Sequence, residues 1–231
     1  MGEALEAYLN GETKAAITVI SDITEDDVIP VSYLFRNFNE MPEIEQIALK
    51  KCNGNVLDIG AGAGSHALYL QQKGLHVTAL DISLKAVLVM KKRGVENAIA
   101  ADFWQFQSAE KFDTILLLMN GIGLAGKLEK LPEFFSHLKN LLNPSGKILL
   151  ESSDLLYMFE EEDGSVVLDL NGTYYGEVQY QMAFQGKKGF PFPWLFVDFP
   201  LLADAAAEAG FQAEMLYEGE NSEYLAELTL L

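Results

Sequence analysis

A carboxylate and three regularly spaced glycines form the stretch of this sequence with the clearest chemical meaning. Asp58 lies near the end of an apolar run, and Gly60, Gly62 and Gly64 follow it before a helix-like segment begins. Glycine tolerates positive φ and has no Cβ, so a ligand can approach the backbone of such a turn, near the N–H groups that open the helix. The pattern predicts a binding site for a nucleotide-like ligand.

A second carboxylate stands at the offset that suits a ribose. Asp81 follows the next apolar run, residues 77–80, about twenty residues after the first glycine, where an acidic side chain can accept hydrogen bonds from ribose hydroxyls. A dinucleotide-binding turn would have a glycine at position 65, but this chain has Ser65. The spacing therefore favours a ligand other than a nicotinamide dinucleotide.

The Asp-x-Gly-x-Gly-x-Gly sequence resembles the first motif of the class I S-adenosylmethionine-dependent methyltransferases. In this family the second strand ends in an acidic residue, as at Asp81, and a further acidic residue faces the adenine amino group, a position that Asp102 matches. The resemblance implies S-adenosylmethionine as the cofactor. Its methionyl part would lie over the glycines with Asp58 near its ammonium group, and its adenine against Ile82, Asp102 and Phe103. In a second interpretation, Asp81 and Asp102 are strand-end carboxylates that cap helices.

The apolar run 112–118 is too continuous for a half-exposed strand and leads into the loop Asn-Gly-Ile-Gly at 120–123. In the family this strand end commonly carries residues that face the substrate, so Asn120 either hydrogen-bonds the substrate or shapes the turn. The loop lacks the Asn/Asp-Pro-Pro-Tyr/Phe form found in many enzymes that methylate bases and glutamine. This departure argues against a nucleobase or amide nitrogen as the methyl acceptor.

No catalytic residue is assigned from the sequence. Methyl transfer from a sulfonium needs mainly alignment of the reacting atoms, so the absence of a conspicuous acid–base motif is compatible with catalysis. His66 lies in the first turn after the glycines, and His137 lies on a helix expected to pack on the sheet. Neither position favours the role of a general base.

Residues 1–50 carry no glycine-rich strand motif, and the apolar spacing of 42–49 predicts an amphipathic helix that opens at proline. We therefore expect an N-terminal helical cap, which in this family commonly closes over the cofactor. Arg36 in this cap either binds a carboxylate, of the cofactor's methionine end or of the substrate, or forms a surface ion pair with Glu40 or Glu43.

The resemblance implies a Rossmann-like α/β fold. Its seven-stranded, mostly parallel sheet would have the order 3-2-1-4-5-7-6, with helices on both faces and strand 7 antiparallel. A chain of 231 residues fits one such domain. We expect a helical cap over 1–50, a cofactor-binding core over 51–153, an inserted β-hairpin and aromatic lid over 154–200, and a closing helix with antiparallel strands over 201–231.

Aromatic side chains are concentrated in the expected insertion. Residues 172–185 alternate with a period of about two and end at a turn-like sequence, which predicts the hairpin. The segment 190–196 that follows contains Trp194 and two prolines. These aromatics form either a lid over a small, largely apolar or planar substrate, with Trp194 facing it, or a satellite core or homodimer contact.

The composition excludes several classes of partner. Asp and Glu number 34 against 16 Lys and Arg, for a net charge of -18, which would repel nucleic acid and anionic lipid. No apolar run is long enough to cross a bilayer, the N-terminus is acidic where a secretory signal is basic, and Cys52 is the single cysteine. We expect a cytoplasmic protein without a metal site.

These observations favour an S-adenosylmethionine-dependent methyltransferase that acts on a small molecule, mainly by approximation and orientation. A regulatory or partner subunit that binds S-adenosylmethionine without catalysis is the main alternative, since a fold does not determine a function. A nicotinamide-dependent oxidoreductase is less favoured because of Ser65.

Overall fold

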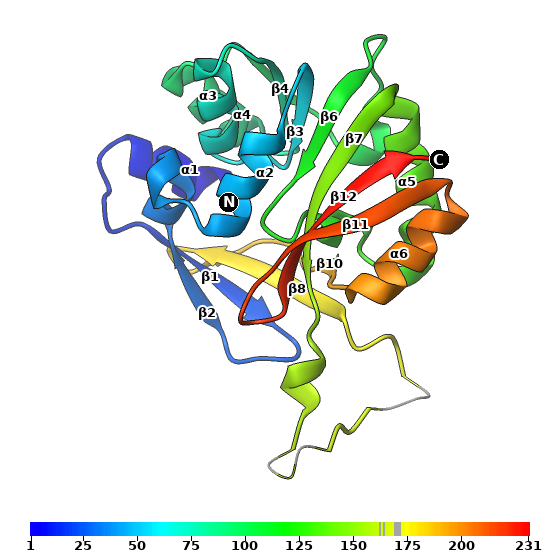
Figure 1. Ribbon diagram of the computed structural model, residues 1–231. Coiled ribbons are helices and arrows are strands. Elements are labelled where there is room, and N and C mark those ends of the chain that lie inside the picture. Colours follow the sequence, from blue (N-terminus) through cyan, green and yellow to red (C-terminus); the bar gives the residue numbers. More distant parts are fainter. Residues whose placement is uncertain (162, 164, 169–171) are drawn as a thin grey trace.

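A seven-stranded sheet forms the centre of the protein (Figure 1). The computed structural model describes residues 1–231 except 162, 164 and 169–171, which fall within the expected insertion. The strands follow the spatial order β11-β12-β7-β6-β3-β4-β5, and β12 runs antiparallel to both of its neighbours. In chain order they are β3 (Asn55–Ile59), β4 (His76–Asp81), β5 (Asn97–Ala100), β6 (Phe112–Leu117), β7 (Leu142–Ser153), β11 (Phe211–Glu218) and β12 (Glu223–Leu230). The expected mostly parallel sheet is confirmed.

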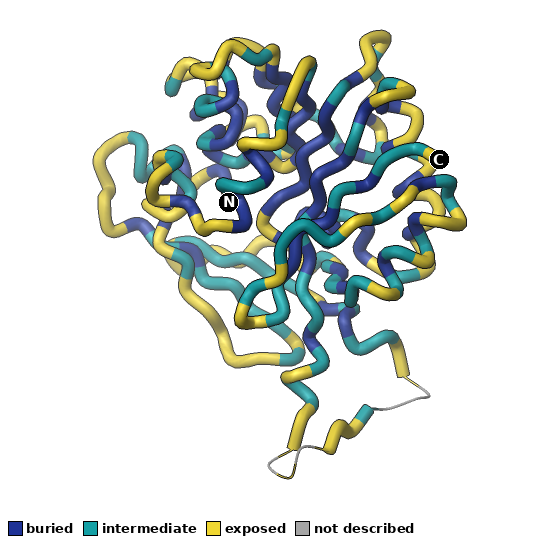
Figure 2. The backbone as a smooth tube through the Cα atoms, in the orientation of Figure 1, coloured by how far each residue is buried: buried dark blue, intermediate teal, exposed yellow. Residues whose placement is uncertain are grey.

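Helices cover both faces of this sheet and create two apolar cores. On one face lie α2 (Glu43–Lys51), α3 (Ser65–Gln72) and α4 (Leu84–Arg93), and on the other α5 (Leu131–Leu141) and α6 (Phe199–Glu208). The central strands are buried from both sides, as Figure 2 shows, and their sequences are accordingly continuous apolar runs rather than alternating ones.

The ends of the predicted helices agree with the structure. Helix α2 begins directly after Pro42. Helix α6 begins where the Asp198 side chain accepts a hydrogen bond from the backbone N–H of Leu201, and it ends just before Gly210, whose φ is 85°. The strands expected near 211–217 and 224–230 are β11 and β12.

A second, antiparallel sheet lies beside the first and contains strands from both ends of the chain. Its order is β10-β8-β1-β2, with the two-residue β9 paired to β8. These strands are β1 (Ala16–Ser21), β2 (Asp27–Pro30), β8 (Glu177–Phe184), β9 (Lys187–Lys188) and β10 (Phe192–Leu195). The predicted hairpin exists as β8 and β9, but β8 also pairs along its length with β1 and β10.

The expected N-terminal helical cap is therefore wrong over residues 16–30. Helix α1 (Gly2–Leu9) and α2 are helical, but the segment between them contains β1 and β2. The run Ile-Thr-Val-Ile at 17–20 consists of β-branched residues, which favour a strand. Its partner β8 lies far away in the sequence, so the pairing gives no local signal.

Register places one face of the second sheet over the carboxyl ends of the central strands. Val19 lies opposite both Asp27 and Met182, and Ser21 lies opposite Tyr180, which in turn faces Phe192. Residues directly opposite each other in a sheet share a face, and side chains two positions apart share it too.

Short 3-10 helices connect the main elements: η1 (Val31–Phe35), η2 (Phe38–Glu40), η3 (Phe103–Gln105), η4 (Gly121–Ala125), η5 (Leu128–Lys130) and η6 (Leu156–Phe159).

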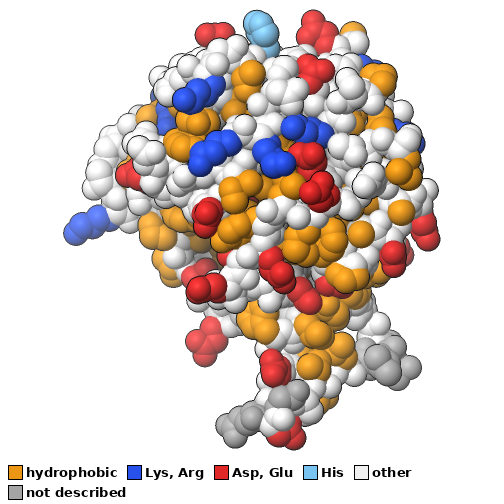
Figure 3. Space-filling view, viewed as in Figure 1, with side chains coloured by type: hydrophobic (Ala, Val, Ile, Leu, Met, Phe, Trp, Pro, Cys, Tyr) orange, Lys and Arg blue, Asp and Glu red, His pale blue; other side chains and the backbone are white. Residues whose placement is uncertain are grey.

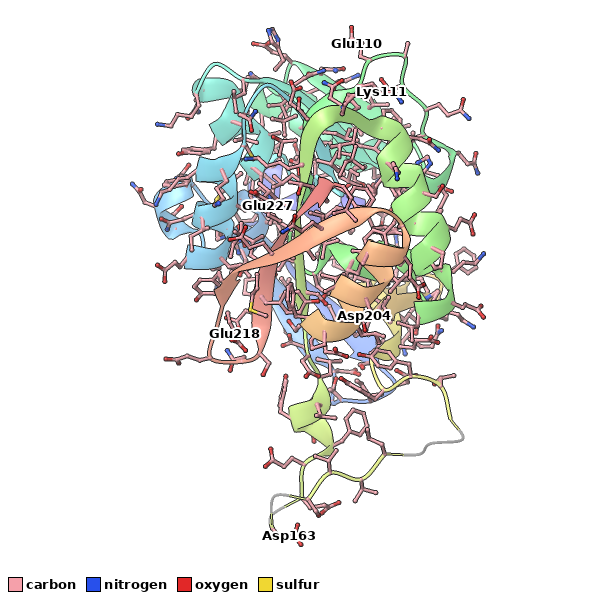
Figure 4. The ribbon with its side chains drawn as sticks, turned by 45° about the vertical axis from the view of Figure 1, so that its right-hand side comes forward. Glu110, Lys111, Asp163, Asp204, Glu218 and Glu227 are labelled. Carbon is pink, nitrogen blue, oxygen red and sulfur yellow. The ribbon has the colours of Figure 1, made fainter. Side chains whose placement is uncertain are left out.

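The edge where the parallel strands begin and the segment that contains Asp163 lie at opposite ends of the molecule (Figure 4). Figure 4 shows Glu110 and Lys111 at the edge where the parallel strands begin, and Asp163 at the tip of a segment that extends away from both sheets at the opposite end. Among the described residues, no helix has the length and apolar character needed to cross a membrane.

Phe134 offers a test of the core on the α5 side of the sheet. Its side chain has no exposed surface, so Phe134→Ala should lower the free energy of unfolding by about 3 to 5 kcal/mol, through lost burial and the cavity left behind. Urea denaturation followed by circular dichroism measures this. Phe190→Ala is the matched control, because Phe190 is 93% exposed. Equal losses in the two variants would contradict the assigned packing.

Candidate active site

The glycine turn after β3 has the geometry that the sequence predicts. Gly60, Gly62 and Gly64 have φ of 76°, 56° and 82°, in the left-handed region that favours glycine. A Cβ at Gly64 would lie 2.8 Å from Val95 Cγ2, whereas a Cβ at Gly60 would meet nothing within 4 Å. Gly64 is therefore required for packing against the α4 side, and Gly60 opens onto free space.

Asp81 at the end of β4 holds the glycine turn in place. Its Oδ2 accepts a hydrogen bond from the Gly62 N–H at 2.9 Å, and its Oδ1 accepts one from the Ser83 N–H at 2.8 Å. Burial raises the pKa of Asp81, although these two donors act in the opposite direction. Each oxygen retains a second lone pair, so the carboxylate can also accept from a ligand.

A cavity of about 430 Å³ separates the glycine turn from the second sheet. Six of the predicted site residues line it: Asp58, Gly60, Gly62, Asp81, Asn120 and Trp194. The rest of its wall comes from Met1, the segment around Tyr33 to Arg36, the start of α3 at Ser65 and His66, the loop after β6, and one face of the second sheet. The structure thus brings together the two halves of the sequence prediction, the glycine motif and the aromatic insertion.

Four predicted residues do not line this cavity. Gly64 packs behind the turn, and Ile82 is 76% exposed. The Asp102 side chain accepts a hydrogen bond from the Trp104 N–H at 3.0 Å and so caps η3, and the Phe103 ring packs in the core beside Phe134. Their contact with adenine stays a prediction.

A buried ionic network lies at one end of the cavity. Arg36 Nη2 donates to Glu45 Oε1 at 2.5 Å, and His66 Nε2 lies 2.7 Å from Glu45 Oε2. The Tyr33 ring covers the guanidinium, whose Cζ lies 3.4 Å from the ring centroid. Arg36 is therefore not a surface residue. Of the two interpretations of Arg36, the surface ion pair with Glu40 or Glu43 is wrong, because the carboxylate that faces inward from α2 is Glu45.

The charges in this network stabilise one another. Burial raises the pKa of the Glu45 carboxyl, but His66 and Arg36 outweigh that effect and hold the pKa below its ordinary value. Burial likewise lowers the pKa of His66, but Glu45 and the nearby Asp58 outweigh it and raise the pKa. The network thus favours an ionised Glu45 and a protonated His66.

Two polar groups of opposite charge remain unpartnered beside the network. Arg36 Nε and Nη1 and Asp58 Oδ2 are buried and have no hydrogen-bond partner among the described residues. Burial raises the pKa of Asp58 to about 6. Unsatisfied buried groups are costly, so this end of the cavity fits a ligand that carries both a carboxylate and an ammonium group. The methionyl end of S-adenosylmethionine has both.

Glu151 fixes the loop that carries Asn120. Met119 and Asn120 have φ of 55° and 57°, and their N–H groups donate to Glu151 at 2.8 and 3.2 Å. The Asn120 Nδ2 donates to the Leu195 carbonyl at 3.0 Å, while its Oδ1 is buried without a partner among the described residues. Asn120 therefore shapes the turn, and it also lines the cavity with an acceptor atom that is free of any partner among the described residues.

Sequence reasoning missed several residues of this site. Glu45 and Glu151 do not belong to the recognised motifs, and the cavity-facing residues of β1 and β2, Val19, Ser21, Asp27 and Ile29, lie in a segment expected to be helical. The β-branched run at 17–20 was the available signal for these strands.

Comparison with known proteins places this fold and site in a family. Residues 32–213 match the family described as "Methyltransferase domain". A SAM-dependent methyltransferase from Bacteroides fragilis, solved in complex with S-adenosyl-L-homocysteine, is 45% identical with a TM-score of 0.92, and the match covers 99% of this chain and 93% of that one. The chain belongs to the methyltransferase-domain family, in the class that uses S-adenosylmethionine.

More distant proteins share the fold or a part of the sequence. DesVI from Streptomyces venezuelae is 14% identical with a TM-score of 0.58, over 99% of this chain and 98% of that one. The cypemycin N-terminal methyltransferase of Streptomyces sp is 26% identical over 102 residues, which are 43% of this chain and 42% of that protein. The matched stretch thus spans less than half of the curated relatives' lengths.

The buried Glu151 predicts a pH-dependent stability. Burial raises its pKa from 4.5 to about 7, so its contribution to folding is present below the ordinary pKa and is lost as the pH rises through about 7. The wild type should therefore lose on the order of 2 kcal/mol relative to Glu151→Gln between about pH 4.5 and about pH 7. Urea denaturation across this range measures the difference.

The exposed Glu208→Gln serves as the control, since it should follow the wild-type pH dependence. Parallel pH profiles for wild type and Glu151→Gln would show that the Glu151 carboxyl does not titrate differently on folding.

Proposed function

We propose that this protein transfers a methyl group from S-adenosylmethionine to a small molecule held in the cavity between the glycine turn and the second sheet. The observation that carries the proposal is the pair of buried, unpartnered groups on Arg36 and Asp58, at the end of the cavity next to the glycine turn. Counted from β3, the main sheet has the order 3-2-1-4-5-7-6, which supports the same family assignment.

Each cofactor-binding role follows from a position in the site. Arg36 Nε and Nη1 bind the methionyl carboxylate, and Asp58 Oδ2 binds the ammonium group. The backbone of Gly60 and Gly62 borders the methionyl chain, and Asp81 accepts from the ribose hydroxyls. The adenine extends beyond the cavity toward Ile82, Asp102 and Phe103, with the backbone of Phe103 as its contact because that ring is buried in the core.

Alignment is the main contribution of the protein to the reaction. The sulfonium of the bound cofactor supplies an activated methyl group. The chain's residues hold both reactants in one cavity, and positioning of this kind contributes up to about 7 to 11 kcal/mol in well-oriented systems. Side chains of the second sheet cover the cavity and limit the access of water.

The aromatic segment 190–196 acts as a lid rather than as an interface. Trp194 lines the cavity, and its indole packs so closely on Gly123 that a Cβ at that position would collide with it. The exception is Phe190, which is exposed and points away from the fold. We assign β1, β2, β8 and β10 to the cover of the site, above the cofactor-binding core at 51–153, and expect the enzyme to be cytoplasmic.

A comparison of two ligands distinguishes a role of Arg36 in cofactor binding from a general loss of structure in the variant. S-adenosylhomocysteine has the methionyl carboxylate, whereas 5′-methylthioadenosine lacks the whole amino-acid end. Arg36→Gln should weaken binding of the first by roughly 10- to 100-fold, since loss of a charge-assisted hydrogen bond costs about 1.5 to 3 kcal/mol, and leave the second nearly unchanged. Isothermal titration calorimetry measures both.

Lys92→Gln is the control, because Lys92 is an exposed cation on α4 and does not line the cavity. Equal losses for both ligands in Arg36→Gln would assign Arg36 a structural role. Failure of the wild type to bind either S-adenosylmethionine or S-adenosylhomocysteine would remove the proposed function itself.

A further inference from the structure

The second sheet presents an aromatic surface to the cavity. Tyr180, Phe192, Trp194 and Phe196 all line it, and we call these four side chains the aromatic roof. They meet edge to face: ring centroids are 6.4 Å apart for Tyr180 and Phe192, 6.2 Å for Tyr180 and Phe196, and 5.9 Å for Phe192 and Trp194. Exposed faces of such rings attract apolar groups and cations.

A polar side chain from the loop after β6 lines the same cavity. Asn120 is 9% exposed, and because its Nδ2 is committed to the Leu195 carbonyl, its Oδ1 is the amide atom that remains for a ligand. A carbonyl oxygen accepts a hydrogen bond but takes no proton at neutral pH. The group that satisfies it must be an N–H or O–H donor.

The charged side chains of the second sheet that line the cavity favour a cationic ligand over an anionic one. Ser21, Thr24 and Asp27 line the cavity at the turn between β1 and β2, a turn that also contains Asp22, Glu25 and Asp26. Of the described lining residues, Arg36, His66 and the Met1 amino group are the cationic ones. Arg36 and His66 are bound to Glu45, and none of the three belongs to the second sheet. The part of the surface over the second sheet in Figure 3 likewise shows acidic side chains, with Lys and Arg gathered in the upper half.

We propose that the methyl acceptor is an amine nitrogen on an apolar, planar body, with its N–H on Asn120 Oδ1 and its body against the aromatic roof. This inference rests on the proposed methyl transfer and names the acceptor class for it. An acceptor that carries a carboxylate or phosphate near the reacting atom would find no cationic side chain among the described residues of the second sheet that line the cavity. The acidic turn attracts a cationic amine to the cavity.

The ammonium form that the acidic turn attracts first releases a proton to water, because an ammonium nitrogen has no lone pair. The lone pair of the free amine forms the new N–C bond, the C–S bond breaks, and its electron pair stays on sulfur, so the sulfonium becomes a neutral thioether. The positive charge moves to the methylated nitrogen, which leaves as an ammonium ion or releases one proton to water. An alcohol, in contrast, would need a general base to take its proton as the new bond forms.

Three probes that share a phenyl ring test this acceptor class: 2-phenylethylamine, 2-phenylethanol and 3-phenylpropanoate. We would titrate each into protein saturated with S-adenosylhomocysteine and measure binding by calorimetry. The amine should bind at least about fivefold more tightly than the other two. Mass spectrometry after incubation with trideuteromethyl-labelled S-adenosylmethionine should find the label on nitrogen.

Asp27→Asn and Asp26→Asn form a matched pair, because both residues are exposed on the same turn but Asp27 alone of the two lines the cavity. Asp27→Asn should weaken amine binding about threefold or more without changing alcohol binding, and Asp26→Asn should change neither. Asn120 is the poorer target for substitution, because its positive φ disfavours most replacements.

Equal or tighter binding of the alcohol or carboxylate, binding of none of the three probes, or label found on oxygen would overturn the amine assignment. Saturating the protein with S-adenosylhomocysteine first distinguishes a failure of the amine assignment from a failure of the proposed methyl transfer. If S-adenosylhomocysteine does not bind, the methyltransferase proposal fails, whereas if it binds and the amine has no advantage, only the acceptor class fails.

Discussion

The buried carboxylate of Glu45 holds the N-terminal segment against the glycine turn. Its side chain is 2% exposed and contacts Arg36 from the segment after η1 and His66 from the first turn of α3. Without Glu45, two cationic groups would remain buried without a counter-charge, which is a costly arrangement. The Ser65 hydroxyl supports the same junction by donating to the Leu34 carbonyl at 2.9 Å. These polar contacts thus help to hold Arg36 at the cavity.

The two sheets supply different parts of the cavity wall. The main sheet supplies the glycine turn and strand-end carboxylates, as expected for ligands at the carboxyl ends of parallel strands. The second sheet supplies the apolar surface above them. Two contacts beside the cavity fix their relative position: the Asn120 amide on the Leu195 carbonyl, and the Trp194 ring on Gly123. A reaction that depends on alignment needs such rigid connections between its two binding surfaces.

The parts of the site that could be predicted are those encoded by neighbouring residues. A strand, a glycine turn and a helix follow one another directly, so Asp58, the glycines and Asp81 could be placed from spacing alone. Spacing did not give the direction of side chains, and Phe103 accordingly points into the core. The second sheet and the partner of Arg36 could not be found, because both depend on contacts between segments that are distant in sequence.

The pairing of β1 with β8 has a consequence for the order in which the molecule assembles. Thr18 lies opposite Ala183, with the whole cofactor-binding core between them in the sequence. Closing such a long loop is slow and entropically unfavourable compared with forming the adjacent strand-helix-strand units. Synthesis proceeds from the N-terminus, so β1 and β2 leave the ribosome before β8 and β10 are made. Until then β1 lacks its partner strand β8. The hairpin of β1 and β2 is therefore an exposed sheet edge for much of the folding process, and its acidic turn residues protect it from pairing with other chains.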